Sequence, residues 1–137
     1  MPWIYSISKH TFSYPGLPDA SDGIYCGGGI APFHNPLLVN NPGACNETNL
    51  GPLPPGTWIM ESIADDPKTG PETIVLVPDA GTTKLCQSLN RGPMSFRIHG
   101  DSLANPGQGS EGCIVAPRDF RVNVLWGSAD KEIIVVP

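Results

Sequence analysis

The chain has little charge, no surplus of basic residues and no long apolar run. Charged residues make up only 15% of the sequence, and 8 Lys and Arg stand against 13 Asp and Glu. This balance provides no basic surface for nucleic acid or an anionic membrane, so neither is expected as a partner. No stretch is apolar for long enough to span a bilayer, which predicts no membrane insertion.

The N-terminal segment also lacks the features of a secretory signal peptide. Its sequence, MPWIYSISKHTF, contains neither a basic n-region nor an apolar h-region. If the protein acts outside the cytoplasm, we therefore expect another machine to export it.

No metal-binding motif is present either. No two of the four cysteines are spaced as C-x₂₋₄-C, and His10 and His34 belong to no pair of ligands. We expect neither a metal nor another cofactor.

Glycine and proline are abundant, with 16 residues of each among 137. This composition predicts many turns and short strands, and the length predicts one mainly β domain over residues 1–137. The predicted strands cover 3–8, 11–14, 23–26, 57–63, 72–78, 95–98, 113–115 and 131–137, with 11–14 returning beside 3–8 as a hairpin. In 57–63, Trp58 and Met60 are expected on one face and Ile59 on the other, and the continuous apolar run 72–78 is typical of a central buried strand. The predicted loops cover 27–49, 64–71 and 79–93.

One helix is predicted, over residues 117–126, after the last cysteine. Proline suits its first turn, and Phe120, Val124 and Leu125 recur at helical spacing before Gly127 ends it.

Residues 95–116 contain the strongest candidate for a chemical site. His99 lies at the end of a predicted strand, and Cys113 begins the next apolar run. If the two strands pair side by side, the imidazole and the thiol come together although they are 113−99 = 14 positions apart. A neighbouring imidazole can take the thiol proton and so produce the attacking thiolate. The pattern therefore predicts a nucleophile and its base.

Gly112, immediately before Cys113, is expected to permit a tight turn that leaves nearby amides free to stabilise an oxyanion. The alternative is that Cys113 is a buried apolar filler or half of a disulfide, which is the commoner use of a cysteine in a small domain.

The other three cysteines can form at most one internal disulfide. Cys45 and Cys86 have polar, loop-like surroundings and are the predicted pair, whereas Cys26 is expected to be a small buried side chain. Such a bridge would imply an oxidising compartment. The alternative is that all four cysteines are free thiols in a reducing compartment.

The motif residues resemble a known active-site signature. His99-Gly100, a loop of small polar residues and Ser110-x-Gly112-Cys113-Ile114 are similar to the L,D-transpeptidase (YkuD-like) families, in which His-Gly precedes Ser-His-Gly-Cys. Papain-like and NlpC-type peptidases have the opposite order of Cys and His, and the Thr-Leu-x-Thr-Cys motif of sortases is absent.

Further elements along nearly the whole chain resemble the type VI secretion L,D-transpeptidase effectors, formerly a domain of unknown function. These elements are Trp3-x-Tyr5-Ser6, Tyr25-x-Gly27, Asn35-Pro36, Gly51-Pro52-Leu53-Pro54-Pro55-Gly56, Gly70-Pro71, Phe96-Arg97-Ile98-His99-Gly100-Asp101 and Ser110-x-Gly112-Cys113-Ile114.

This resemblance implies a compact β-sandwich or barrel-like domain with one short helix after the catalytic cysteine. It implies an antibacterial toxin that acts on peptidoglycan stem peptides in the periplasm of a target cell. The activity would be L,D-carboxypeptidase removal of terminal D-Ala from tetrapeptides, L,D-transpeptidase exchange of that residue for a D-amino acid, or both. The implied partners are the secretion machinery and a cognate immunity protein, and we expect a monomer.

The resemblance also implies roles for individual residues. Cys113 is the nucleophile, His99 is the base and later the acid, and Ser110 and Gly112 shape the turn. The amides of Gly112 and Cys113 are expected to form the oxyanion hole. The residues expected to orient the base or to bind substrate are Gly100, Asp101, Arg97, Arg118 and Arg121.

The sequence departs from the broader signature at two positions. Glu111 replaces a second His, and its carboxylate disfavours a thiolate if it points inward. Val115 replaces a frequent Arg or Asn, so the substrate carboxylate must be recognised by other residues. Two alternatives stay open: a housekeeping cell-wall L,D-transpeptidase, and a non-catalytic wall-binding module in which Cys113 is structural.

Overall fold

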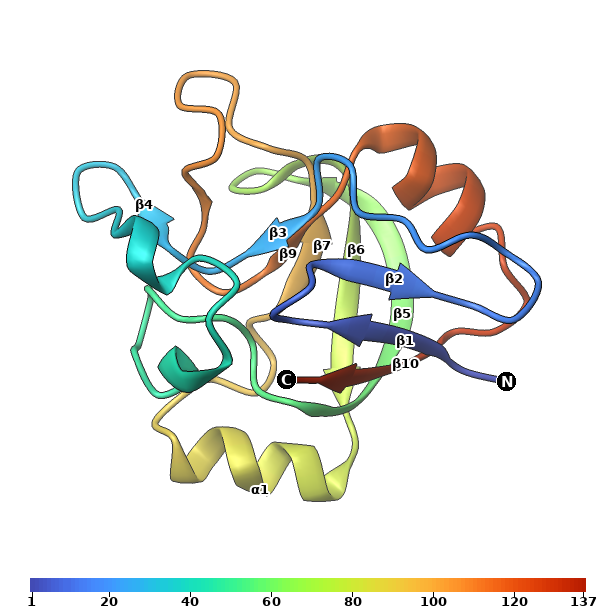
Figure 1. Cartoon of the computed structure of the whole chain (residues 1–137), viewed down its shortest axis with the longest axis horizontal. Helices are drawn as coiled ribbons and strands as arrows, with labels where there is room; N and C mark the ends of the chain where they lie inside the picture. The colour runs from blue at the N-terminus through green and yellow to red at the C-terminus, as the bar shows by residue number, and fades with distance from the viewer.

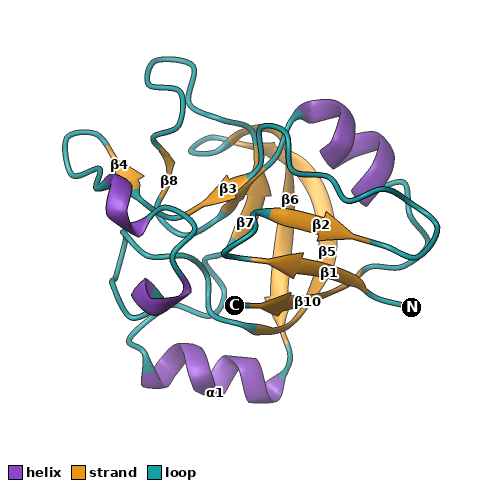
Figure 2. Cartoon of the chain, viewed as in Figure 1, coloured by secondary structure: helices purple, strands orange, loops and turns teal.

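The computed structural model describes all 137 residues, and its main feature is a curved sheet of eight strands (Figure 1). The strand order is β2-β1-β10-β5-β6-β7-β9-β3, and β4 and β8 form a separate pair. The strands are β1 (Trp3–Ser6), β2 (Thr11–Ser13), β3 (Tyr25–Cys26), β4 (Gly29–Ile30), β5 (Gly56–Asp66), β6 (Gly70–Pro78), β7 (Arg97–His99), β8 (Gly109–Ser110), β9 (Ile114–Val115) and β10 (Glu132–Val136). The helices are η1 (Pro36–Leu38), η2 (Pro42–Ala44), α1 (Ala80–Ser88) and η3 (Phe120–Leu125). The prediction of a mainly β fold is confirmed, and the sheet curls into a half-barrel (Figure 2).

The long hairpin of β5 and β6 forms the middle of the sheet. In β5, Trp58 and Met60 are buried in the core, whereas Ile59 between them is 37% exposed. This alternation is the period of two that the sequence predicted. β6 lies between β5 and β7, which confirms the prediction of a central strand over 72–78.

The tip of this hairpin corrects the loop predicted over 64–71. β5 continues to Asp66 and β6 begins at Gly70, so only a short turn remains. The carboxylate of Asp66 accepts hydrogen bonds from the amides of Lys68, at 2.8 Å, and Thr69, at 3.0 Å. These bonds fix the turn. The segment is polar because the end of the hairpin extends into solvent.

Helix α1 corrects the loop predicted over 79–93. Asp79 caps its first turn by accepting a hydrogen bond from the amide of Thr82 at 2.8 Å, as an N-cap residue does. Only Thr82 and Cys86, four positions apart on one face, are buried. Because so narrow a buried face gives a weak apolar period, the sequence pattern did not distinguish this helix from a loop.

The helix predicted over 117–126 is confirmed in position but differs in type. Its central part, η3, is a π-helix, and beyond it the amide of Trp126 donates to the carbonyl of Arg121 at 3.0 Å. Arg121 and Leu125 are buried on its inner side. None of the helices combines the length and the apolar character that crossing a membrane requires.

The first and last strands are neighbours in the sheet. β1 pairs with β2 as the predicted hairpin and, on its other side, runs parallel to β10, with Trp3 opposite Ile133. β10 in turn pairs with β5 in antiparallel orientation. β10 thus connects the N-terminal hairpin of β1 and β2 to the central hairpin of β5 and β6.

The structure contains no disulfide bond. Cys26, Cys45 and Cys86 are buried free thiols, and Cys113 is a partly buried free thiol. The bridge predicted between Cys45 and Cys86 is therefore not formed. The prediction assumed loop surroundings for both residues, but Cys86 lies on the buried face of α1 and Cys45 belongs to the core.

Candidate active site

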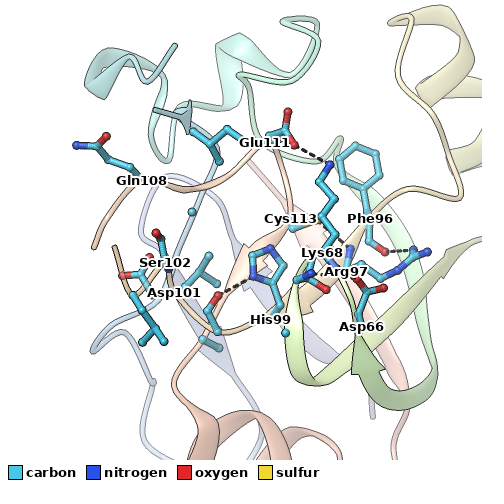
Figure 3. Close-up of a pocket in the computed structure, with 18 of the residues that line it drawn as sticks. Asp66, Lys68, Phe96, Arg97, His99, Asp101, Ser102, Gln108, Glu111 and Cys113 are labelled. Carbon is cyan, nitrogen blue, oxygen red and sulfur yellow. Dashed lines mark hydrogen bonds and ion pairs between the residues drawn. The ribbon is translucent and has the colours of Figure 1, made fainter. Parts of the chain in front are cut away.

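A cleft of about 1270 Å³ lies beside β7 and β9 and is lined by both His99 and Cys113. Its walls include the tip of the β5–β6 hairpin and the loop over residues 101–109. The strand pairing explains why the two residues share this cleft. β7 and β9 are parallel neighbours, with Ile98 opposite Ile114, and Cys113 immediately precedes β9. The predicted side-by-side pairing of these strands is confirmed, and Figure 3 shows the imidazole close to Cys113.

His99 is held by the backbone of the next residue. Its Nδ1 lies 2.7 Å from the carbonyl oxygen of Gly100 (Figure 3). A carbonyl only accepts hydrogen bonds, so Nδ1 carries the proton and Nε2 of the neutral ring has a free lone pair. This is the tautomer that a base needs, and here the carbonyl of Gly100 orients the imidazole. Burial of the ring lowers the pKa of His99.

The thiol of Cys113 is subject to opposing influences. Burial raises its pKa, and the negative charge of Glu111 acts in the same direction. The amide of Arg97, which donates to Sγ at 3.3 Å, and the positive charges of Arg97 and Lys68 lower it. Burial dominates, so the net pKa is raised. The resting state is therefore a thiol in the same cleft as a neutral imidazole.

The pKa of His99 gives a prediction about pH. An ordinary histidine titrates near about 6.5, and burial disfavours the imidazolium form, so the ring of His99 stays neutral at pH values where a free histidine is half charged. An NMR titration of the ring should give a midpoint below that of the same residue in urea. A midpoint equal to or above the urea value would contradict the assigned state of the base.

Ser110 and Gly112 shape the turn before the cysteine, as expected. The Ser110 hydroxyl donates to the carbonyl of Cys113 at 2.5 Å and accepts from the amides of Gly27, at 2.8 Å, and Gly112, at 3.1 Å. Gly112 has φ +138°, and an added Cβ would lie 2.5 Å from Nη2 of Arg91. Both observations require glycine at this position.

The expected oxyanion hole needs one correction. The amide of Gly112 is already bound to the Ser110 hydroxyl, so it does not point at a substrate. The amide of Cys113 makes no hydrogen bond within the protein and remains available.

Arg91 is a site residue that sequence reasoning missed. Its guanidinium is buried and donates to the carbonyls of Cys45 at 2.9 Å, Gly51 at 3.0 Å, Pro52 at 3.2 Å and Glu111 at 3.0 Å. It thereby joins the segment around residue 51 to the loop that precedes Cys113. No local pattern marked this role, because one arginine in a predicted loop is usually solvated.

The three arginines proposed for substrate binding have different positions. Arg121 is buried and donates to the carbonyls of Glu72 and Ala116 at 2.8 and 2.6 Å, so it is a structural residue rather than a free ligand. Arg118 forms an exposed ion pair with Glu72 at 2.7 Å. Arg97 lines the cleft next to Cys113 and remains a candidate.

Asp101 organises the loop that forms one wall of the cleft. Its carboxylate accepts hydrogen bonds from the hydroxyl of Tyr25 at 2.5 Å and the amides of Ser102, at 2.8 Å, and Gly107, at 3.0 Å. Gly100 acts through the carbonyl that holds His99. These contacts give Gly100 and Asp101 positioning roles, and contact of either residue with substrate stays a prediction.

Lys68 is the second residue that the sequence analysis missed. It extends from the hairpin tip and forms an ion pair with Glu111 at 2.9 Å, in front of Cys113 (Figure 3). Glu111 therefore has a cationic partner that offsets its effect on the thiol. Only the contact between residues 68 and 111, which are far apart in the chain, shows the role of Lys68, and no local sequence pattern reveals such a contact.

No group of three or more His, Cys, Asp or Glu side chains lies close enough together to hold a metal ion. In comparisons with known proteins, no family model and no curated protein matched the chain.

Proposed function

We propose that the chain is a cysteine-dependent acyl-transfer enzyme acting on peptidoglycan stem peptides, as an L,D-carboxypeptidase, an L,D-transpeptidase or both. The observation that carries this proposal is that His99 and Cys113 line one cleft, with Nδ1 of His99 held by the carbonyl of Gly100. The His-Gly and Ser-x-Gly-Cys motifs that contain these residues supply the resemblance to L,D-transpeptidases. The curved mainly β sheet is compatible with the fold that this resemblance implies.

The first half of the reaction would produce a thioester. Nε2 of His99 takes the proton of Cys113, and the sulfur attacks the carbonyl carbon of the bond before the terminal D-Ala. The carbonyl oxygen becomes an oxyanion near the amide of Cys113. The C–N bond then breaks, and the imidazolium returns its proton to the nitrogen of the departing D-Ala.

The second half would release the enzyme. Water attacks the thioester carbonyl with His99 again as base, the C–S bond breaks, and the sulfur recovers a proton, which gives a shortened stem peptide. If the amine of a free D-amino acid attacks instead, the product is an exchanged stem peptide. The cleft reaches the surface, so both nucleophiles have access to the thioester.

The biological setting follows from the resemblance to type VI secretion effectors. The protein would be an antibacterial toxin, delivered to the target-cell periplasm and neutralised in the producer by a cognate immunity protein. A housekeeping cell-wall L,D-transpeptidase would use the same chemistry.

One observation favours a different class, a non-catalytic wall-binding module. The Cys113 sulfur has backbone partners, accepting from the amide of Arg97 at 3.3 Å and lying 3.9 Å from the carbonyl of Ser95. Burial also raises the pKa of the thiol. Such a cysteine can be structural, in which case Cys113 would resist alkylation in the native protein.

Incubation with purified tetrapeptide muropeptides tests the proposal. We expect loss of one alanine by mass analysis, and replacement of that alanine when a free D-amino acid is added. The Cys113→Ala protein, handled in the same way, is the control. Unchanged muropeptides in both conditions, with a folded protein, would contradict the proposed activity.

A further inference from the structure

The turn at the tip of the β5–β6 hairpin directs one cation across the candidate active site. The Asp66 carboxylate holds the turn through the amides of Lys68 and Thr69. From this fixed backbone, Nζ of Lys68 reaches Oε1 of Glu111 at 2.9 Å. In Figure 3 the lysine side chain passes in front of Cys113. A flexible cationic side chain therefore lies in the same cleft as the thiol.

The two ends of this ion pair differ in their exposure to solvent. The backbone of Glu111 is held by Arg91, whose Nη2 donates to its carbonyl at 3.0 Å. Lys68 is anchored only through its backbone, and its side chain is 77% exposed against 28% for Glu111. An ion pair this exposed contributes little stability. A ligand carboxylate can therefore replace Glu111 as the partner of Lys68.

The surrounding charges also favour an anion at this place. Arg97 lines the same cleft, and its Nη1 donates to the carbonyls of Met94 and Phe96, both at 2.9 Å, so the guanidinium is fixed. Arg97 forms no ion pair with a carboxylate. The carboxylate of Asp66 interacts with its charge from farther away and accepts hydrogen bonds from the amides of Lys68 and Thr69. Lys68 and Arg97 thus place two cations beside the nucleophile.

We propose that Lys68 is a specificity-determining residue that binds a substrate carboxylate next to Cys113, with Glu111 as its counter-ion in the resting state. The identification of the ligand as the C-terminal carboxylate of a stem peptide rests on the proposed function. In that case the ammonium group selects peptides whose free carboxylate lies one residue beyond the scissile bond. It moves from Glu111 to the substrate when the cleft fills, and this movement uncovers the thiol.

Two small alkylating reagents test the anion site without requiring turnover. Iodoacetate and iodoacetamide both react with the thiolate. The rate with iodoacetate divided by the rate with iodoacetamide at Cys113 therefore does not depend on how much thiolate is present. A cation that binds carboxylates near the sulfur raises this ratio. We expect Lys68→Met to lower the ratio roughly fivefold, and Glu111→Gln, which frees the lysine, to raise it by a similar factor. Peptide mapping assigns the reaction to Cys113 rather than to the buried cysteines.

Two further variants complete the design. Lys68→Arg retains the charge, so its ratio of alkylation rates should stay close to that of the unchanged protein. Lys84→Met removes a charge from the exposed side of α1 and should leave the ratio of alkylation rates unchanged. An unchanged ratio in Lys68→Met, or an unchanged or lower ratio in Glu111→Gln, would overturn the proposal. A protein that turns over no muropeptide but shows the expected ratios would retain the anion site and lose only the proposed function.

Discussion

Replacement of Cys113 by alanine is expected to reduce muropeptide turnover by on the order of 10⁴-fold or more, and replacement of His99 by alanine should have a comparable effect. The alanine at 113 removes the sulfur that forms the thioester. The alanine at position 99 removes the lone pair that takes the thiol proton, and the thiol is mainly protonated because burial raises its pKa. Because the two residues act as one unit, the double variant should be no worse than either single variant. Initial rates of D-Ala release from a purified tetrapeptide measure the effect.

Gln108→Ala is the matched control for these two variants. Gln108 also lines the cleft, but it has no chemical role in the proposed mechanism. Circular dichroism and thermal unfolding should show that all the variants are folded. Turnover by a folded Cys113→Ala protein would eliminate the covalent mechanism, and full activity of His99→Ala would eliminate this residue as the base.

The second large effect is on stability. Arg91→Met should lower the free energy of unfolding by about 3 to 5 kcal/mol. The substitution keeps an apolar stem but removes the donors to the carbonyls of Cys45, Gly51, Pro52 and Glu111. These acceptors lose a partner inside the protein, where water does not replace it fully. Urea unfolding followed by tryptophan fluorescence measures the difference.

Arg118→Met is the control for the loss of an arginine. The Arg118 side chain is 63% exposed, and its ion pair with Glu72 is the kind that contributes about 1 kcal/mol or less. If the two variants unfold at the same urea concentration, the buried hydrogen bonds of Arg91 do not stabilise the fold as inferred.

Local patterns were sufficient to predict eight of the ten strands and the grouping of His99 and Cys113 in one cleft. They missed the two-residue strands β4 and β8, and the loop predicted over 27–49 contains β4 and the short helices η1 and η2. Alternation around Trp58 located β5, and the apolar run 72–78 located β6. The spacing of His99 and Cys113 at the ends of two strand-like runs predicted their approach, because neighbouring strands align such positions. These features depend on periodicity and on residues close in sequence.

The features that the sequence did not predict depend on contacts between distant residues. Arg91 reaches carbonyls more than 35 positions away in the chain, from Cys45 to Pro52, and Lys68 reaches Glu111. In each case one charged residue has a specific partner that no local pattern identifies. Helix α1 was missed for a different reason, since its single narrow buried face resembles the pattern of a loop.

The position of β10 between β1 and β5 also determines when the fold can be completed during synthesis. Trp3 pairs with Ile133, so β1 must wait for a partner that is 133−3 = 130 positions later in the chain. Until that segment leaves the ribosome, the N-terminal hairpin has an unpaired edge with apolar side chains, and such edges promote aggregation. The nascent chain therefore has to be kept from associating with other chains, and the last step of folding follows translation of residues 132–136.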